Sequence, residues 1–179
     1  MSFTDSSIAP IDEPYHRQMT SYRRTRSAIL EATRTLIAMH GLQLMSMIEI
    51  ADTAEVSRAT LYNHFRNKES VLAGLLEYEV ARILELASNE RSLDQTLARM
   101  SIEISSDSAL ATIRATDPAV LTQILSSGAG PLWEQIRASL AQALCAPNTV
   151  ELALRWLIGQ VLQPLTPDES RQQARAITS

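Results

Sequence analysis

The side chains best suited to specific chemistry lie between residues 58 and 64. Arg58 can present two parallel N–H donors to O6 and N7 of guanine, the commonest specific contact in the major groove of DNA. Ala59 or the methyl group of Thr60 can contact the methyl group of thymine. On a helix over 58–65, Leu61 and Phe65 share the inward side. The outward arc is polar but not acidic, and its members are Arg58, Ala59, Thr60, Tyr62 and Asn63.

Lys68 is the only lysine of the chain, and it falls in the first turn of the next predicted helix. The helix dipole disfavours a cation there. A phosphate bound at the same N-terminus would reverse this effect, because backbone N–H groups and the ammonium would act together. The alternative is a solvated surface charge. The same two interpretations, a phosphate-binding arm or a solvated run, are open for Arg23, Arg24 and Arg26.

The remaining reactive residues are too scattered for a catalytic or metal site. His16, His40 and His64 lie on separate segments with no histidine partner at i+4 and no cysteine nearby, so we expect no metal. No Ser-His-acid or Cys-His arrangement can be placed, and no glycine loop could cradle a phosphate. Cys145 is expected to be a small buried apolar residue. Neither an enzyme nor a cofactor is expected.

Charge is distributed unevenly along the 179 residues, which carry a formal net charge of −4. Residues 1–15 contribute −3, residues 16–68 contribute +4 and residues 69–179 contribute −5. A basic segment followed by an acidic body indicates that only the basic part faces a phosphate backbone. A single cysteine and the absence of a long apolar run favour a cytoplasmic protein without a membrane span.

Helix signals run along the whole chain, and no alternating run of five residues predicts a strand. Residues 1–21 lack an apolar period and are expected to form a mobile arm. A first helix is predicted from Arg24 to His40, where Gly41 can provide a left-handed C-cap. Further capping residues and prolines bring the expected total to nine or ten helices and indicate an all-α fold.

Two short helices and a tight turn are predicted before the long fourth helix. Ser46 and Glu49 form a capping box at the start of the first, and Ser57 is a good N-cap for the second. Asn67 can cap the long helix, which extends to about Ser88 and spans about 30 Å. A helix of this length is suited to connect two halves of the molecule.

The segment SRATLYNHFRNKE, residues 57–69, resembles the DNA-binding domain of the tetracycline-repressor (TetR) family. The likeness extends over about Thr25–Leu76, whereas the rest of the chain matches only in the number and order of helices. The resemblance implies a helix-turn-helix DNA-binding domain at 22–67 and a helical regulatory and dimerisation domain at 68–179. It implies DNA contacts from Ser46, Ser57, Arg58, Ala59, Thr60, Tyr62, Asn63, His64 and Lys68.

One position departs from the family pattern. The turn between the two short helices commonly has glycine where this chain has Glu55. A residue other than glycine at positive φ costs about 1 kcal/mol. We therefore expect either a different turn or modest strain.

Two C-terminal segments predict an interface. Pro131–Leu144 has an apolar stripe, and Thr149–Leu162 is apolar on nearly all sides, so it must be covered on all sides. A second copy could cover it in an isologous four-helix bundle, as in the family. The alternative is that the pair lies in the core of one subunit. The expected interface residues are Trp133, Ile136, Leu140, Leu154, Ile158 and Val161.

Together with the family resemblance, these features predict a homodimeric transcription repressor that reads a pseudo-palindromic double-stranded operator. Its two recognition helices, predicted over 58–65 of each copy, would lie about 34–36 Å apart. The family resemblance also implies that a small-molecule effector releases the protein from DNA. No residue of the sequence identifies the ligand pocket. The aromatic content of 4% favours an aliphatic or amphipathic ligand. The alternatives are a helical ligand-binding or adaptor protein that does not bind DNA, and an activator or ligand-independent regulator.

Overall fold

The computed structural model describes residues 13–127 and 130–178. These residues form ten α-helices and one 3₁₀ turn and contain no strand, which confirms the predicted all-α class. The helices are α1 (Glu13–His40), α2 (Met47–Thr53), α3 (Arg58–His64), α4 (Lys68–Ala87), α5 (Leu93–Ser106), α6 (Ser108–Thr116), α7 (Pro118–Ser127), α8 (Pro131–Leu144), α9 (Val150–Leu162) and α10 (Pro167–Thr178), with the 3₁₀ turn at Pro147–Thr149.

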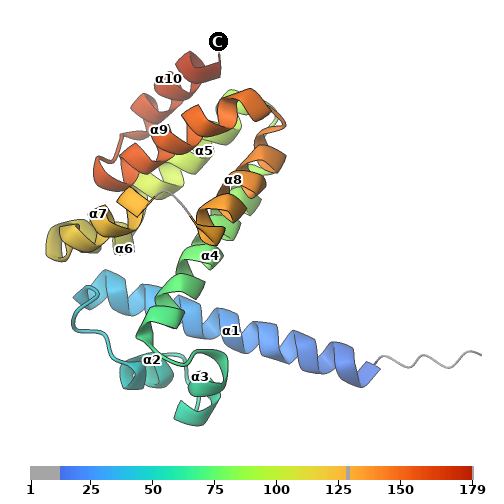
Figure 1. Cartoon of the computed structure of the whole chain (residues 1–179), viewed down its shortest axis with the longest axis vertical. Helices are drawn as coiled ribbons and strands as arrows, with labels where there is room; N and C mark the ends of the chain where they lie inside the picture. Colours follow the sequence, from blue (N-terminus) through green and yellow to red (C-terminus); the bar gives the residue numbers. More distant parts are fainter. Residues whose placement is uncertain (1–12, 128–129, 179) are drawn as a thin grey trace, which may run out of the picture.

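Helix α1 begins at Glu13 rather than near Arg24, so it includes part of the segment 1–21 that was expected to be a mobile arm. Once a helix is nucleated, each further residue adds a backbone hydrogen bond, so a polar segment can extend it without an apolar period. The rest of the predicted arm, residues 1–12, lies outside the described residues. Figure 1 shows α1 projecting beyond α2 and α3.

Local capping defines the two short helices as predicted. Ser46 Oγ accepts from the backbone N–H of Glu49 at 3.3 Å, and the Glu49 carboxylate accepts from the N–H of Ser46 at 2.8 Å. Ser57 Oγ accepts from the N–H of Thr60 at 3.0 Å. Between the helices, Glu55 has φ +54°, so the turn is the strained one of the two expected forms.

Two hydrophobic cores share α4. The first contains buried side chains of α1–α3, the α1–α2 loop and the first part of α4, together with Ala109, Ile113 and Leu121 from α6 and α7. The second joins the end of α4 to α5, α8, α9 and α10. In Figure 1, α4 rises from the lower lobe of α1–α3 into the upper bundle. A movement of α4 therefore involves both cores.

Polar contacts also join α1, in the lower lobe, to α6. Arg34 of α1 donates to Asp107 at 2.5 Å, and this carboxylate caps α6 by accepting from the N–H of Leu110 at 2.8 Å. The hydroxyl of Thr112 donates to the carbonyl of Ala38 at 2.8 Å. The C-terminal part of α1 is thus fixed against α6.

The packing of α8 and α9 corrects the predicted interface. Trp133, Leu140 and Leu154 are buried within the protomer, so they need no partner to cover them. Helices α5 and α8 already cover one side of α9. The sequence of α9 alone could not show which helices pack against it. Of the other predicted interface residues, Ile136, Ile158 and Val161 are half-buried against the cores.

Cys145 also differs from the expectation. It is exposed rather than buried, because it forms the left-handed C-cap of α8, at φ +50°, beyond the last helical turn. In the described ranges, no helix combines the length and apolar character needed to cross a bilayer, and no three His, Cys, Asp or Glu side chains are grouped as for a metal ion.

Candidate nucleic-acid interface

Helix α3 has one buried and one exposed side, as predicted. Leu61 is fully buried and Phe65 is buried at the C-cap of the helix. The other side leaves most of the predicted outward arc in solvent: Arg58, Ala59, Tyr62 and Asn63 are exposed, and Thr60 is half-exposed. This surface contains donors, a methyl group and an aromatic ring, the groups that base edges in the major groove can contact.

Some predicted contact residues also have structural bonds. Ser46 and Ser57 are the N-caps of α2 and α3, and the hydroxyls of Ser57 and Thr60 lie 2.8 Å apart. A hydroxyl retains acceptor capacity after one such bond, so capping does not prevent contact with a phosphate or base. The caps also orient the α3 N-terminus from which Arg58 extends.

A packed group around Phe65 holds α3 in place. The guanidinium of Arg26 lies 5.0 Å from the centre of the Phe65 ring, a distance typical of a cation–π contact. Gly74 of α4 faces the same ring, and a Cβ at this position would lie 2.7 Å from Phe65 Cε1. Only glycine gives the ring this space without displacement. Gly74 was not among the residues predicted from the sequence, although a lone glycine inside a helix signals close packing.

His64 is held by α1. Its ring lies 4.2 Å from that of Tyr22, and its Nδ1 is buried without a hydrogen-bond partner among the described residues. Burial, and secondarily the charge of Arg26, lower the pKa of His64. The lowered pKa favours the neutral imidazole, which offers one N–H donor and no positive charge to a phosphate. The Tyr22 contact could not be predicted, because Tyr22 was placed at the edge of the arm.

Lys68 is also held by the protein. Its ammonium, at the start of α4, donates to the carbonyl oxygen of Leu42 in the α1–α2 loop. An ammonium has three N–H donors, so this bond leaves two for a phosphate. The bond fixes the side chain beside α2 and offers a structural reason for a lysine at a helix N-terminus.

Comparison with known proteins relates this domain to one family. Residues 29–75 match the model of "Bacterial regulatory proteins, tetR family". The segment 29–75 is thus similar to the corresponding domain of TetR-family regulators. The matched segment contains α2, α3, the first part of α4 and the C-terminal part of α1, so the predicted resemblance is confirmed.

The curated relatives match only part of the chain. An HTH-type transcriptional regulator of Haemophilus influenzae is 36% identical over 70 residues, which are 38% of this chain and 35% of that protein. The HTH-type transcriptional repressor KstR of Mycobacterium tuberculosis is 36% identical over 61 residues, 34% of this chain and 28% of KstR. The matches thus span about a third of the length of these relatives.

Solved structures resemble most of the chain. The TetR family repressor AlkX from Dietzia sp. aligns with a TM-score of 0.64 at 21% identity, covering 85% of this chain and 92% of AlkX. GusR of Salmonella enterica aligns with a TM-score of 0.55 at 22% identity, covering 86% and 91%. At these identities the likeness concerns the fold, in which a TetR-family domain is followed by a helical bundle.

Proposed function

We propose that the protein is a homodimeric transcription repressor that binds a pseudo-palindromic operator through α3. The observation that carries this proposal is the exposed arc of α3, mounted on buried Leu61 and Phe65 within a TetR-family domain. The +4 charge of residues 16–68 favours approach of this lobe to DNA despite the acidic body. The proposed contacts are those predicted from the sequence, with Arg58 reading a base.

Selection of bound sequences from genomic DNA, followed by mobility shift with the full chain, tests this function. Arg58→Ala should lower affinity by about 1–3 kcal/mol and relax discrimination at one base pair per half-site. Arg91→Ala removes an exposed arginine before α5 and should leave binding unchanged. Equal loss on all sequences would assign Arg58 to the DNA backbone. Absence of DNA binding would favour the adaptor alternative.

A second copy is proposed to pack on α9. Leu152 and Leu162 are 54% and 46% exposed, and Gly159 lies between them on the exposed side of the helix. A Cβ at Gly159 would meet no atom within 4 Å, so a neighbouring side chain could enter there. Antiparallel packing of two α9 helices around a two-fold axis near Arg155 would place Leu152 of each copy over Gly159 of the other, because the two positions are two helical turns apart.

Charged side chains flank this apolar stripe. Glu151 pairs with Arg137 of α8 at 3.2 Å and with Arg155 at 3.4 Å. Two guanidinium groups thus share one carboxylate at the rim of the face, and the apolar stripe itself carries the proposal. The dimer is therefore proposed to form through exposed α9 residues rather than through the buried Trp133, Leu140 and Leu154.

Release by a ligand is proposed to act through α4. This helix contributes Val71 and Leu75 to the core of the DNA-binding lobe and Ala87 to the upper core. A ligand that favours another orientation of the upper bundle would change the spacing of the two recognition helices and lower operator affinity.

Repression itself is tested in the cell. A reporter gene under the selected operator should be repressed by the protein.

A further inference from the structure

A cavity of about 110 Å³ lies between α4 and α8. Most of its wall is apolar, with Ala81 and Leu84 on α4 and Leu132 and Ile136 on α8. Three polar side chains complete it: Glu77, Gln135 and Ser139. A cavity of about 150 Å³ can hold the six carbon atoms of benzene, so this one suits a ligand of about four or five non-hydrogen atoms.

Glu77 is the polar group that connects the cavity to the DNA-binding lobe. Gly74, Glu77, Ala81 and Leu84 follow one another on one side of α4 at spacings of three or four residues. Gly74 touches Phe65, so Glu77 marks the end of the cavity toward α3. Its carboxylate lies 3.6 Å from the guanidinium of Arg26.

The carboxylate of Glu77 has unused capacity. A distance of 3.6 Å is too long for a hydrogen bond, and a carboxylate has about four acceptor positions. The side chain is 47% exposed, so a solute can reach it. A cation with a short apolar tail would match both the carboxylate and the aliphatic wall.

We propose that this cavity binds a small amphiphilic cation of the primary alkylammonium class. The ammonium binds Glu77, and the alkyl chain lies between Ala81 and Leu84 of α4 and Leu132 and Ile136 of α8. Gln135 and Ser139 offer further oxygen acceptors from α8 to the ammonium donors.

Ligand binding at this site can also affect the packing of α3, and this regulatory effect rests on the proposed function. A bound ammonium competes with Arg26 for Glu77. Arg26 also lies over Phe65, the residue that ends α3, so losing its ion pair loosens the packing of the recognition helix. Ligand and DNA then oppose each other, and each lowers the affinity of the other by the same factor.

Titration of the ¹⁵N-labelled full chain with n-butylammonium chloride tests the site by NMR. We expect saturable shifts of amides in α4 and α8, and at least tenfold weaker binding by n-butanol and butyrate, which lack the positive charge. Glu77→Gln should weaken butylammonium at least tenfold, and Ala81→Leu should block it by filling the cavity. Glu85→Gln, which changes an exposed carboxylate of the same helix outside the cavity wall, is the matched control and should bind normally.

Two results would overturn the site: no saturable shifts in the wild type, or equal weakening by Glu77→Gln and Glu85→Gln. The regulatory step is measured separately, as the butylammonium dependence of DNA binding relative to sodium chloride at equal ionic strength. Ligand binding without any DNA binding would contradict the proposed function and leave the site intact. DNA binding that butylammonium does not weaken, despite saturation of the site, would overturn the competition with Arg26.

Discussion

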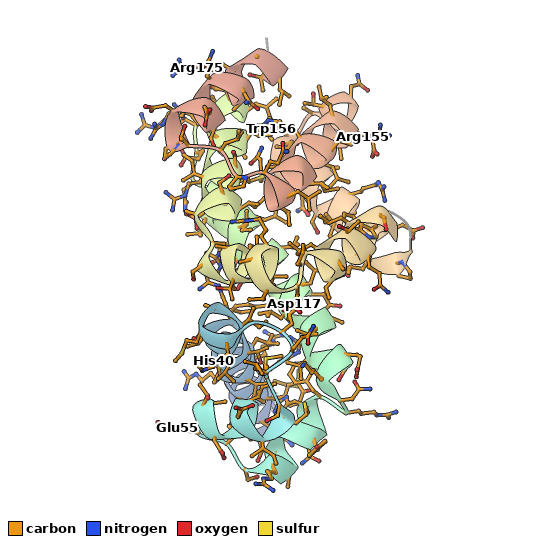
Figure 2. All side chains as sticks on the ribbon, turned by 90° about the vertical axis from the view of Figure 1, so that its left-hand side faces the viewer. His40, Glu55, Asp117, Arg155, Trp156 and Arg175 are labelled. Atoms are coloured by element: carbon orange, nitrogen blue, oxygen red, sulfur yellow. The ribbon has the colours of Figure 1, made fainter. Side chains whose placement is uncertain are left out.

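The carboxylate of Asp117 accepts a hydrogen bond from the backbone N–H of Leu42 at 3.3 Å. Asp117 is 5% exposed and lies between α6 and α7, at the boundary between the two lobes in Figure 2. Leu42 follows Gly41, whose φ is +79°, at the end of α1. A Cβ at Gly41 would lie 2.7 Å from the hydroxyl oxygen of Thr116. Close packing and one carboxylate therefore fix the end of α1 against the junction of α6 and α7.

This carboxylate predicts a pH dependence of stability. The hydroxyl of Thr116 is the main group that lowers the pKa of Asp117 below 3.8, assisted by Gln43 and the N–H of Leu42. A lowered folded pKa contributes stability that is present above the unfolded value and is lost as pH falls through the folded value. Asp117→Asn should therefore lower the Tm at pH 7, and the difference from wild type should shrink below about pH 4.

Thermal unfolding followed by circular dichroism between pH 2.5 and 7 measures this difference. Asp168→Asn is the control, because Asp168 is exposed and its ion pair within the described residues is a local one with Arg171, three residues away, at 2.7 Å. It should change the Tm little at any pH. A Tm difference for Asp117→Asn that does not depend on pH would assign the loss to packing rather than to the charge.

Glu55 provides a test of backbone strain. Replacement by glycine should raise the free energy of unfolding by about 0.5–1 kcal/mol, because glycine adopts φ +54° without a Cβ clash. Glu55→Ala keeps the Cβ and should give no such gain. Urea unfolding of the three proteins measures the effect. A loss of stability in Glu55→Gly would mean that the greater freedom of the unfolded glycine chain outweighs the relief of strain.

Lys68 is expected to have two separable roles. Lys68→Met keeps an apolar stem but leaves the carbonyl of Leu42 without its donor, which should cost about 1–3 kcal/mol of stability. If the two remaining N–H donors contact a phosphate, the negative slope of log affinity against log salt concentration should also become smaller in magnitude by about one. Chemical unfolding and filter binding measure the two effects. An unchanged slope with reduced stability would mean that Lys68 has the structural role alone and does not contact a phosphate.

The proposed dimer predicts a specific cross-link. In a Cys145→Ser background, the double variant Leu152→Cys/Gly159→Cys should form intermolecular disulfides under mild oxidation, because each new cysteine would face the other type across the two-fold axis. Each single variant should form far fewer. Non-reducing electrophoresis and sedimentation measure the outcome. A dimer that does not cross-link would require another interface, and a monomer would contradict dimerisation itself.

The sequence by itself determined the local structure and the family of the DNA-binding domain. Ser46, Ser57 and Asn67 cap their helices through bonds to residues three positions away, so their effect could be derived from spacing. The inward side of α3 followed from Leu61 and Phe65 in the same way. The motif at 57–69 indicated the family because it combines these local signals in a short segment.

Only the tertiary structure decided which surfaces remain free. The burial of Trp133, Leu140 and Leu154 within one protomer depends on which helices surround α8 and α9, and apolar periodicity alone cannot distinguish a neighbouring helix from a second copy. The bond from Lys68 to Leu42, the contact of Tyr22 with His64 and the proximity of Glu77 to Arg26 join residues far apart in sequence. Such contacts depend on how the helices pack, which no local spacing encodes.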